Sequence, residues 1–136
     1  MRILAIDPGE KNIGVAISDP TGTIANPLNI IKHVSRQSDA SSIVQIASQY
    51  DVGLIIVGQA LDTEGHPTAQ SRRAARLARE IMSLTPIPTI LWDESGSTQA
   101  AKAARLAMGA TRRKRGGHLD DIAATYILQD YLDHHA

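Results

Sequence analysis

Short apolar runs alternate with polar, turn-rich segments along much of the chain, and this pattern predicts strands of a buried sheet. The runs are rich in isoleucine, leucine and valine and are bounded by glycine, proline or charged residues. We predict strands at residues 3–6, 13–18, 28–33, 54–57 and 89–92. Residues 7–12 have strong turn chemistry, which predicts a hairpin between the first two strands.

Apolar residues recur at helical spacing in the remaining segments. We predict helices at residues 39–50, 68–83, 97–108 and 118–133. The second of these has one apolar face and, opposite to it, a face of four arginines: Arg72, Arg73, Arg76 and Arg79. We interpret this arginine face as a solvated surface, and a binding role is the less favoured alternative. The element order β-β-β-α-β-α-β-α-α predicts an α/β fold with a mixed five-stranded sheet and helices on both faces.

The composition narrows the possible classes of protein. The chain has 136 residues, which suits one domain over residues 1–136. Cysteine is absent, so any bound metal needs oxygen or imidazole ligands. The first residues reach a charge too soon for a signal peptide, and no apolar run is long enough to span a membrane. We therefore expect a cytoplasmic protein with no membrane partner.

The formal net charge of zero hides an uneven distribution. Residues 72–115 contain ten lysines and arginines but only three acids, whereas residues 118–136 contain four acids and neither lysine nor arginine. A basic stretch of this kind can bind a polyanion such as nucleic acid. Candidate phosphate contacts are Lys11 in the first turn and the basic run Arg112, Arg113, Lys114 and Arg115. Taken alone, that run would more often be a solvated loop.

Two acidic residues follow predicted buried strands directly, where a carboxylate is unusual. Asp7 ends the first apolar run and begins a turn, and Glu94 follows the last run after Asp93. Ligands of open α/β sheets collect beyond the carboxyl ends of the strands, so both positions favour a site.

The third candidate carboxylate is Asp120, in the last predicted helix. At about 100° per residue it lies near the centre of an apolar stripe. That stripe consists of Ala123, Ala124, Ile127, Leu128 and Tyr131. An acid there costs several kcal/mol unless a cation or a hydrogen-bond donor meets it. Asp121 lies at the edge of the stripe and is the weaker candidate.

Three carboxylates without cysteine suit a hard cation, Mg²⁺ or Mn²⁺. Two such ions about 3.5–4 Å apart activate a water and stabilise a leaving oxygen in phosphodiester hydrolysis. Each carboxylate also has a purely structural interpretation. Asp7 would be a turn acid, Glu94 an ordinary strand-end acid and Asp120 a helix N-terminal acid favoured by the macrodipole. The three together favour a metal site.

The same residues resemble those of a known family. Over nearly its whole length the chain is similar to the YqgF (RuvX) proteins, ribonuclease H-like nucleases related to the RuvC Holliday-junction resolvases. Four segments in order carry the resemblance: residues 6–19, 56–65, 93–94 and 119–132. The family's catalytic aspartates correspond to Asp7 and Asp120, and its Asp-Glu motif to Asp93 and Glu94.

This resemblance implies a ribonuclease H-like fold and a nuclease of structured nucleic acid. Bacterial members are proposed to mature the 5′ end of precursor 16S rRNA, and some members are described as resolving DNA junctions. This chain departs from the family at a few positions. The family's Asp-Glu-Arg-Leu-Thr-Thr continues here with Ser95 and Gly96, so a bidentate arginine is missing. The family's Gly-Leu-Pro is Gly58-Gln59-Ala60, and the asparagine that follows is Asp62.

Three alternatives stay open at the level of sequence. The strand-Asp-turn-strand pattern at residues 7–14 also occurs in actin-like ATPases and sugar kinases, although those proteins clamp nucleotide between two domains. A resolvase of branched DNA would use the same carboxylates. A non-catalytic nucleic-acid-binding module would retain the basic run without cleavage.

Overall fold

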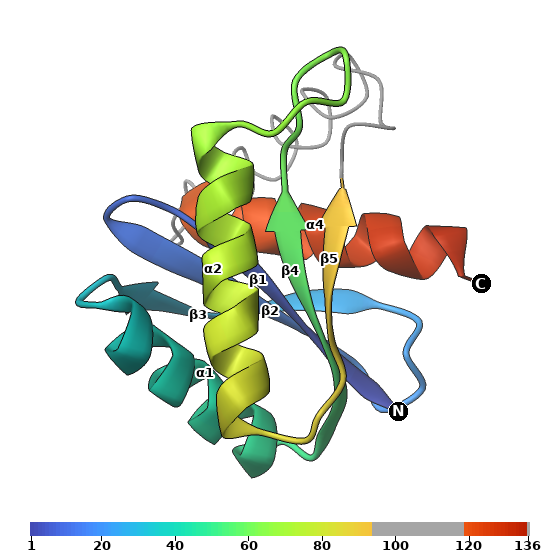
Figure 1. Ribbon diagram of the computed structural model, residues 1–136. Helices are drawn as coiled ribbons and strands as arrows, with labels where there is room; N and C mark the ends of the chain where they lie inside the picture. The colour runs from blue at the N-terminus through green and yellow to red at the C-terminus, as the bar shows by residue number, and fades with distance from the viewer. Residues whose placement is uncertain (94–118, 136) are drawn as a thin grey trace.

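The computed structural model describes residues 1–93 and 119–135, with side chains from Ile122 onward in the second range. Five strands form one mixed sheet (Figure 1). They are β1 (Arg2–Pro8), β2 (Asn12–Ser18), β3 (Ala25–Lys32), β4 (Val52–Gln59) and β5 (Thr89–Asp93). Their order is β3-β2-β1-β4-β5, so β1 is central. The first three strands are antiparallel to one another, while β1, β4 and β5 are parallel, which confirms the predicted mixed sheet.

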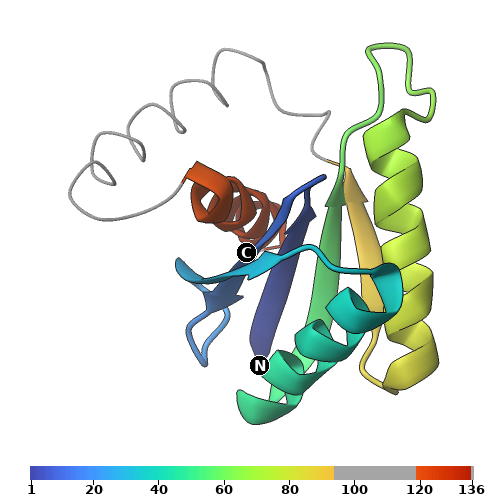
Figure 2. The ribbon, with the colours of Figure 1, turned by 90° about the vertical axis from the view of Figure 1, so that its left-hand side faces the viewer.

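Helices cover both faces of this sheet. The described helices are α1 (Arg36–Gln49), α2 (Ala69–Leu84) and α4 (Leu119–His134). Figure 2 shows α1 and α2 on one face and α4 on the other. Side chains of β1 alternate between the two cores, as strand geometry requires. Leu4 and Ile6 pack in the core under α1 and α2, whereas Ile3 and Ala5 pack in the core under α4.

Helix α4 lies unusually close to the sheet at one point. A Cβ atom built on Gly58 of β4 would overlap Cδ1 of Ile127 and lie 3.2 Å from its Cγ1 and 3.3 Å from its Cγ2. Ala124 of the same helix is fully buried in this core. The predicted apolar stripe thus packs against the sheet, and small residues on both elements permit the close approach.

Two predicted boundaries were wrong. The third strand begins at Ala25 rather than Leu28, and it includes Pro27, because an edge strand tolerates a residue without an N–H donor. The pairing shifts by one residue next to that proline, as in a bulge. Helix α1 begins at Arg36 rather than Asp39, because Ser35 caps it and its first turn is polar and shows no apolar period.

The remaining predicted elements agree closely with the structure where it describes them. Helix α2 starts after Thr68, whose hydroxyl and backbone exchange hydrogen bonds with Ser71 in a capping box. The helix predicted at residues 97–108 lies outside the described residues. None of the three described helices combines the length and apolar character that a membrane span requires.

Candidate functional site

The carboxyl ends of β1, β4 and β5 meet at one edge of the sheet because these three strands are parallel. Ile6, Val57 and Leu91 form one row across them. Asp7 lies one residue beyond this row on β1, and Asp93 lies two residues beyond it on β5. Two strand spacings of about 4.8 Å separate β1 from β5. Side chains at this edge can therefore converge over the end of β4.

The two aspartates at this edge lie on opposite faces of the sheet. Asp7 alternates with Pro8 and shares the face of Ala5, which packs under α4. Trp92 also packs in the α4 core, so the next residue, Asp93, lies on the α2 face. Asp7 is half-buried. Asp93 is thus poorly placed to share an ion with Asp7.

Helix α4 carries Asp120 in its first turn. Gln129, in the second half of the helix, donates a hydrogen bond to the carbonyl of Thr23 and accepts one from the amide of Ala25. Ala25 is the first residue of β3, and Thr23 lies in the β2–β3 loop. That loop lies at the end of β2 away from the β1–β2 turn. The first half of α4 therefore runs toward the turn that follows Asp7, as Figure 1 shows.

The convergence of the three predicted ligands stays a prediction. Glu94 and the basic run 112–115 lie outside the described residues, as does the side chain of Asp120. Within residues 1–93 and 122–135, no group of three histidine or acidic side chains is close enough to hold a metal ion. What the structure describes is Asp7 at the central strand's end, on the face that α4 covers.

The turn after Asp7 is tightly built. A Cβ atom on Gly9 would overlap the carbonyl oxygen of Asn12, so this turn needs glycine. The carbonyl of Lys11 accepts a hydrogen bond of 2.9 Å from the amide of His33, which ties the turn to the end of β3. The side chain of Lys11 is exposed beside the edge that Asp7 occupies.

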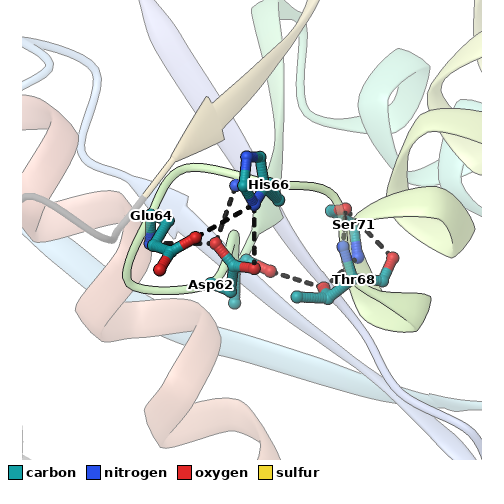
Figure 3. Close-up of polar contacts among 6 residues, drawn as sticks. Asp62, Glu64, His66, Thr68 and Ser71 are labelled. Carbon is teal, nitrogen blue, oxygen red and sulfur yellow. Dashed lines mark hydrogen bonds and ion pairs between the residues drawn. The ribbon is translucent and has the colours of Figure 1, made fainter.

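The loop between β4 and α2 explains one departure from the family pattern. Figure 3 shows Asp62 at its centre, and Oδ1 accepts hydrogen bonds of 2.9 and 2.7 Å from the amides of Glu64 and His66. An asparagine carbonyl can accept the same two bonds. Gly65 has a φ of +83°, which the turn requires. The substitution therefore preserves the loop, and its added charge lies 3.6 Å from the imidazole of His66.

A second departure, Ala60 in place of proline, adds a backbone N–H that needs a partner. Gln70 of α2 accepts that N–H at 2.7 Å through Oε1 and donates to the carbonyl of Gly58 at 3.2 Å. Thr68 donates its hydroxyl to the carbonyl of Ala60 at 2.6 Å. The β4–α2 loop is therefore held by α2 itself, without the rigidity of a proline.

Sequence patterns do not indicate one further feature, a hollow of about 310 Å³ on the α1–α2 face. This α1–α2 hollow lies beside the β1–β2 turn and the end of β3, and its wall includes Pro8, Gly9, His33, Arg36, Arg73 and Arg76. Arg73 and Arg76, two of the four arginines on the predicted solvated face of α2, thus also border this hollow. Helical periodicity alone does not show which exposed residues border a cavity, because α1 and the turn form the other walls.

Solved structures of similar shape define the class of fold. The RuvC structure from Thermus thermophilus aligns with a TM-score of 0.64 at 10% identity, covering 99% of this chain and 96% of that one. The fowlpox virus Holliday junction resolvase aligns with a TM-score of 0.60 at 18% identity and full coverage of both chains. This chain therefore has the ribonuclease H-like fold of the RuvC-type resolvases.

Sequence comparison identifies the family. A family model described as "RuvX: Holliday junction resolvase" matches residues 1–134. A Thermoanaerobacter pseudethanolicus protein named "Putative pre-16S rRNA nuclease" is 42% identical over 134 residues, covering 98% of this chain and 96% of the relative. A Syntrophus aciditrophicus protein of the same name is 39% identical, covering 98% and 89%. The chain belongs to the RuvX family, which disfavours the actin-like ATPase and sugar-kinase alternative.

Proposed function

We propose that this protein is a metal-dependent nuclease that hydrolyses phosphodiester bonds at the 5′ end of precursor 16S rRNA. The observation that carries the proposal is the place of Asp7. It ends the central strand of a resolvase fold, at the edge where three parallel strands finish and on the face that α4 covers. Family membership and the names of the relatives support the nuclease activity and the RNA substrate.

The proposed metal ligands are Asp7, Glu94 and Asp120. Carboxylate oxygens are the donors that Mg²⁺ and Mn²⁺ prefer, and the chain contains no thiol that would favour a softer metal. Bound ions of this kind supply a nucleophilic water at neutral pH and charge neutralisation for the leaving oxygen. The protein's own part would be to hold the three carboxylates close together against their mutual repulsion.

The proposed substrate contacts are Lys11 and the basic run 112–115. Lys11 extends from the turn beside Asp7, and the basic run 112–115 precedes α4 by a few residues. These cations would contact backbone phosphates and set affinity rather than sequence preference. A precursor rRNA substrate also implies a location in the bacterial cytoplasm.

The decisive experiment compares Asp7→Asn with Asp93→Asn as a matched control. Both variants remove one charge at the same sheet edge, but Asp93 lies on the opposite face. Replacing a metal ligand should reduce cleavage of a precursor 16S rRNA fragment by more than the roughly 10–100-fold seen when only an outer partner of a ligand is lost. Asp93→Asn should keep most of its activity. RNA binding by Asp7→Asn should survive or tighten, because one phosphate-repelling charge is gone.

A four-way DNA junction in the same assay tests the alternative substrate. The family description and the solved resolvases favour including it. Cleavage of the precursor RNA, dependent on Mg²⁺ or Mn²⁺ and abolished by chelation, is the expected outcome. Preferential cleavage of the junction would overturn the RNA assignment. Binding of either substrate without cleavage under any metal condition would instead indicate a non-catalytic module.

A further inference from the structure

The α1–α2 hollow borders the β1–β2 turn on the face opposite to α4. Pro8 and Gly9, which directly follow Asp7, contribute to its wall, and α1 and α2 contribute the opposite side. Its volume of about 310 Å³ is at the lower end of ligand pockets, which hold roughly 300–1,000 Å³. The hollow and the side chain of Asp7 thus lie on opposite faces of the sheet, beside the same β1–β2 turn.

Three arginines face this hollow from two helices, and little in the described structure neutralises them. Arg73 pairs with Glu10 at 3.5 Å, but Glu10 is 82% exposed, so the pair is weak. Arg36 and Arg76 make no ion pair within residues 1–93 and 122–135. A planar guanidinium matches phosphate geometry, and several of them around one cavity favour a phosphate over other anions.

Two acidic residues, Glu10 and Asp39, also line the hollow, and the buried one, Asp39, is bonded within the protein. Asp39 is 3% exposed and contacts Nδ1 of His33, and it also accepts a 3.1 Å hydrogen bond from the amide of Val34. Its carboxylate therefore anchors the imidazole of His33 in the wall. With Nδ1 held by Asp39, the other ring nitrogen of His33 is the one available to a ligand.

From this wall we infer that the α1–α2 hollow binds a backbone phosphate of the substrate strand. The shape, the three arginines and the anchored histidine together form a site for one phosphate with part of its sugar. A strand that crosses the β1–β2 turn would place one phosphate in the hollow and another near Asp7. The phosphate bound in the hollow would then determine which phosphodiester bond of the strand lies at Asp7 and is cleaved. The inference rests on the proposed function for its choice of ligand, since a nucleic-acid strand is the polyanion that function supplies.

The test uses two double variants of the same helix with the same loss of charge. Arg73→Ala with Arg76→Ala removes two groups from the wall of the hollow. Arg72→Ala with Arg79→Ala removes two exposed arginines that do not line it. Binding of a short oligouridylate is measured over a salt series in EDTA, where the metal site cannot contribute. Amide NMR signals of Gly9 and Arg36 report occupancy of the hollow, and thermal unfolding confirms that both variants fold.

In the parent and in the control variant, the oligouridylate should shift the Gly9 and Arg36 signals. In the hollow variant those shifts should vanish, and affinity should fall roughly tenfold, as expected when one strong hydrogen bond to a charged group is removed. The slope of affinity against salt should decrease by about 0.7 for each phosphate that the variant no longer binds. Equal weakening in both double variants would overturn the inference, because it would reflect general charge rather than the hollow.

Inorganic phosphate is the second probe, and it distinguishes the source of the ligand. If phosphate shifts the same signals but the hollow variant binds the oligouridylate as tightly as the parent, the strand assignment is wrong. Because every binding measurement is made without metal, it is independent of cleavage. Loss of catalysis with normal binding would refute only the proposed function, whereas normal cleavage with no signal shift at the hollow would refute only this inference.

Discussion

Gly58 controls how closely α4 approaches the sheet, and Gly58→Ala tests that directly. Neither Gly58 nor Gly53, both in β4, has a positive φ, so alanine fits the backbone at each position. At Gly58, however, the new methyl group would overlap Cδ1 of Ile127, which is 1% exposed and β-branched. At Gly53 it would overlap only the side chain of Met1, which is 66% exposed and free to move.

The expected magnitude follows from two opposing terms. Alanine in place of a strand glycine gains about 0.5–1 kcal/mol of stability through chain entropy. Overpacking of a close-packed core costs about 1–3 kcal/mol. We therefore expect Gly58→Ala to lower the free energy of unfolding by about 1–2 kcal/mol. Gly53→Ala, the matched control, should be neutral or slightly stabilising.

A double-mutant cycle with Ile127→Val isolates the contact. Valine lacks the Cδ1 atom that the new methyl would overlap, and alone it should cost about 0.5–1.5 kcal/mol. In the Gly58→Ala background this cost should shrink or reverse, because removing Cδ1 also relieves the clash. Urea unfolding followed by circular dichroism gives all four free energies. If Gly58→Ala is as stable as Gly53→Ala, or if Ile127→Val costs the same in both backgrounds, the close packing of α4 on β4 does not exist in solution.

Two further predictions concern charge. Asp19 in the β2–β3 loop accepts hydrogen bonds from the amide of Ile24, from Thr21 and from the amide of Thr23, which lowers its pKa well below the ordinary value of 3.8. When a carboxyl pKa is lowered by folding, the group stabilises the fold at any pH above its ordinary pKa. This contribution to stability is lost as the pH falls below that ordinary pKa. The stability of Asp19→Asn should therefore fall less steeply than that of the parent as the pH drops below about 4, measured by thermal unfolding. If both proteins lose stability equally over this pH range, the loop's hydrogen bonds to Asp19 are absent in solution. Neutralising the basic run 112–115 should weaken binding to all nucleic-acid sequences alike. The slope of log affinity against log salt concentration should decrease by about 0.7–0.9 for each phosphate contact that is lost. Turnover at saturating substrate should be much less affected. Unaltered affinity in that variant would mean that the run is only a solvated loop.

Local chemistry explains why most elements are visible in the sequence. The runs at β1 and β4 are continuously apolar because both faces of those central strands are covered. The α2 periodicity and the Thr68 cap mark one helix to within a residue. The β3 boundary was less visible because an edge strand is only half-covered and tolerates Pro27, so its burial pattern resembles that of a loop.

Asp7 could be singled out from sequence because a carboxylate at the end of a buried strand conflicts with the local pattern, and such a conflict commonly marks function. Strand alternation puts Asp7 on the same face as Ala5, but only the structure shows that α4 covers that face. The α1–α2 hollow was not visible in this way. Its arginines and His33 come from separate elements, and each of them alone looks like an ordinary surface residue.

The sequence by itself determined the order of the elements, the apolar stripe of α4 and the place of Asp7 at a strand end, because each depends on neighbours within a few residues. Only the tertiary structure decided that Gly58 meets Ile127, that Asp93 lies on the opposite face from Asp7, and that Arg36, Arg73 and Arg76 surround one cavity. These relations depend on how the strands pair in register and which helix covers which face. Contacts between residues far apart in the chain follow from packing of the whole domain, which no local pattern encodes.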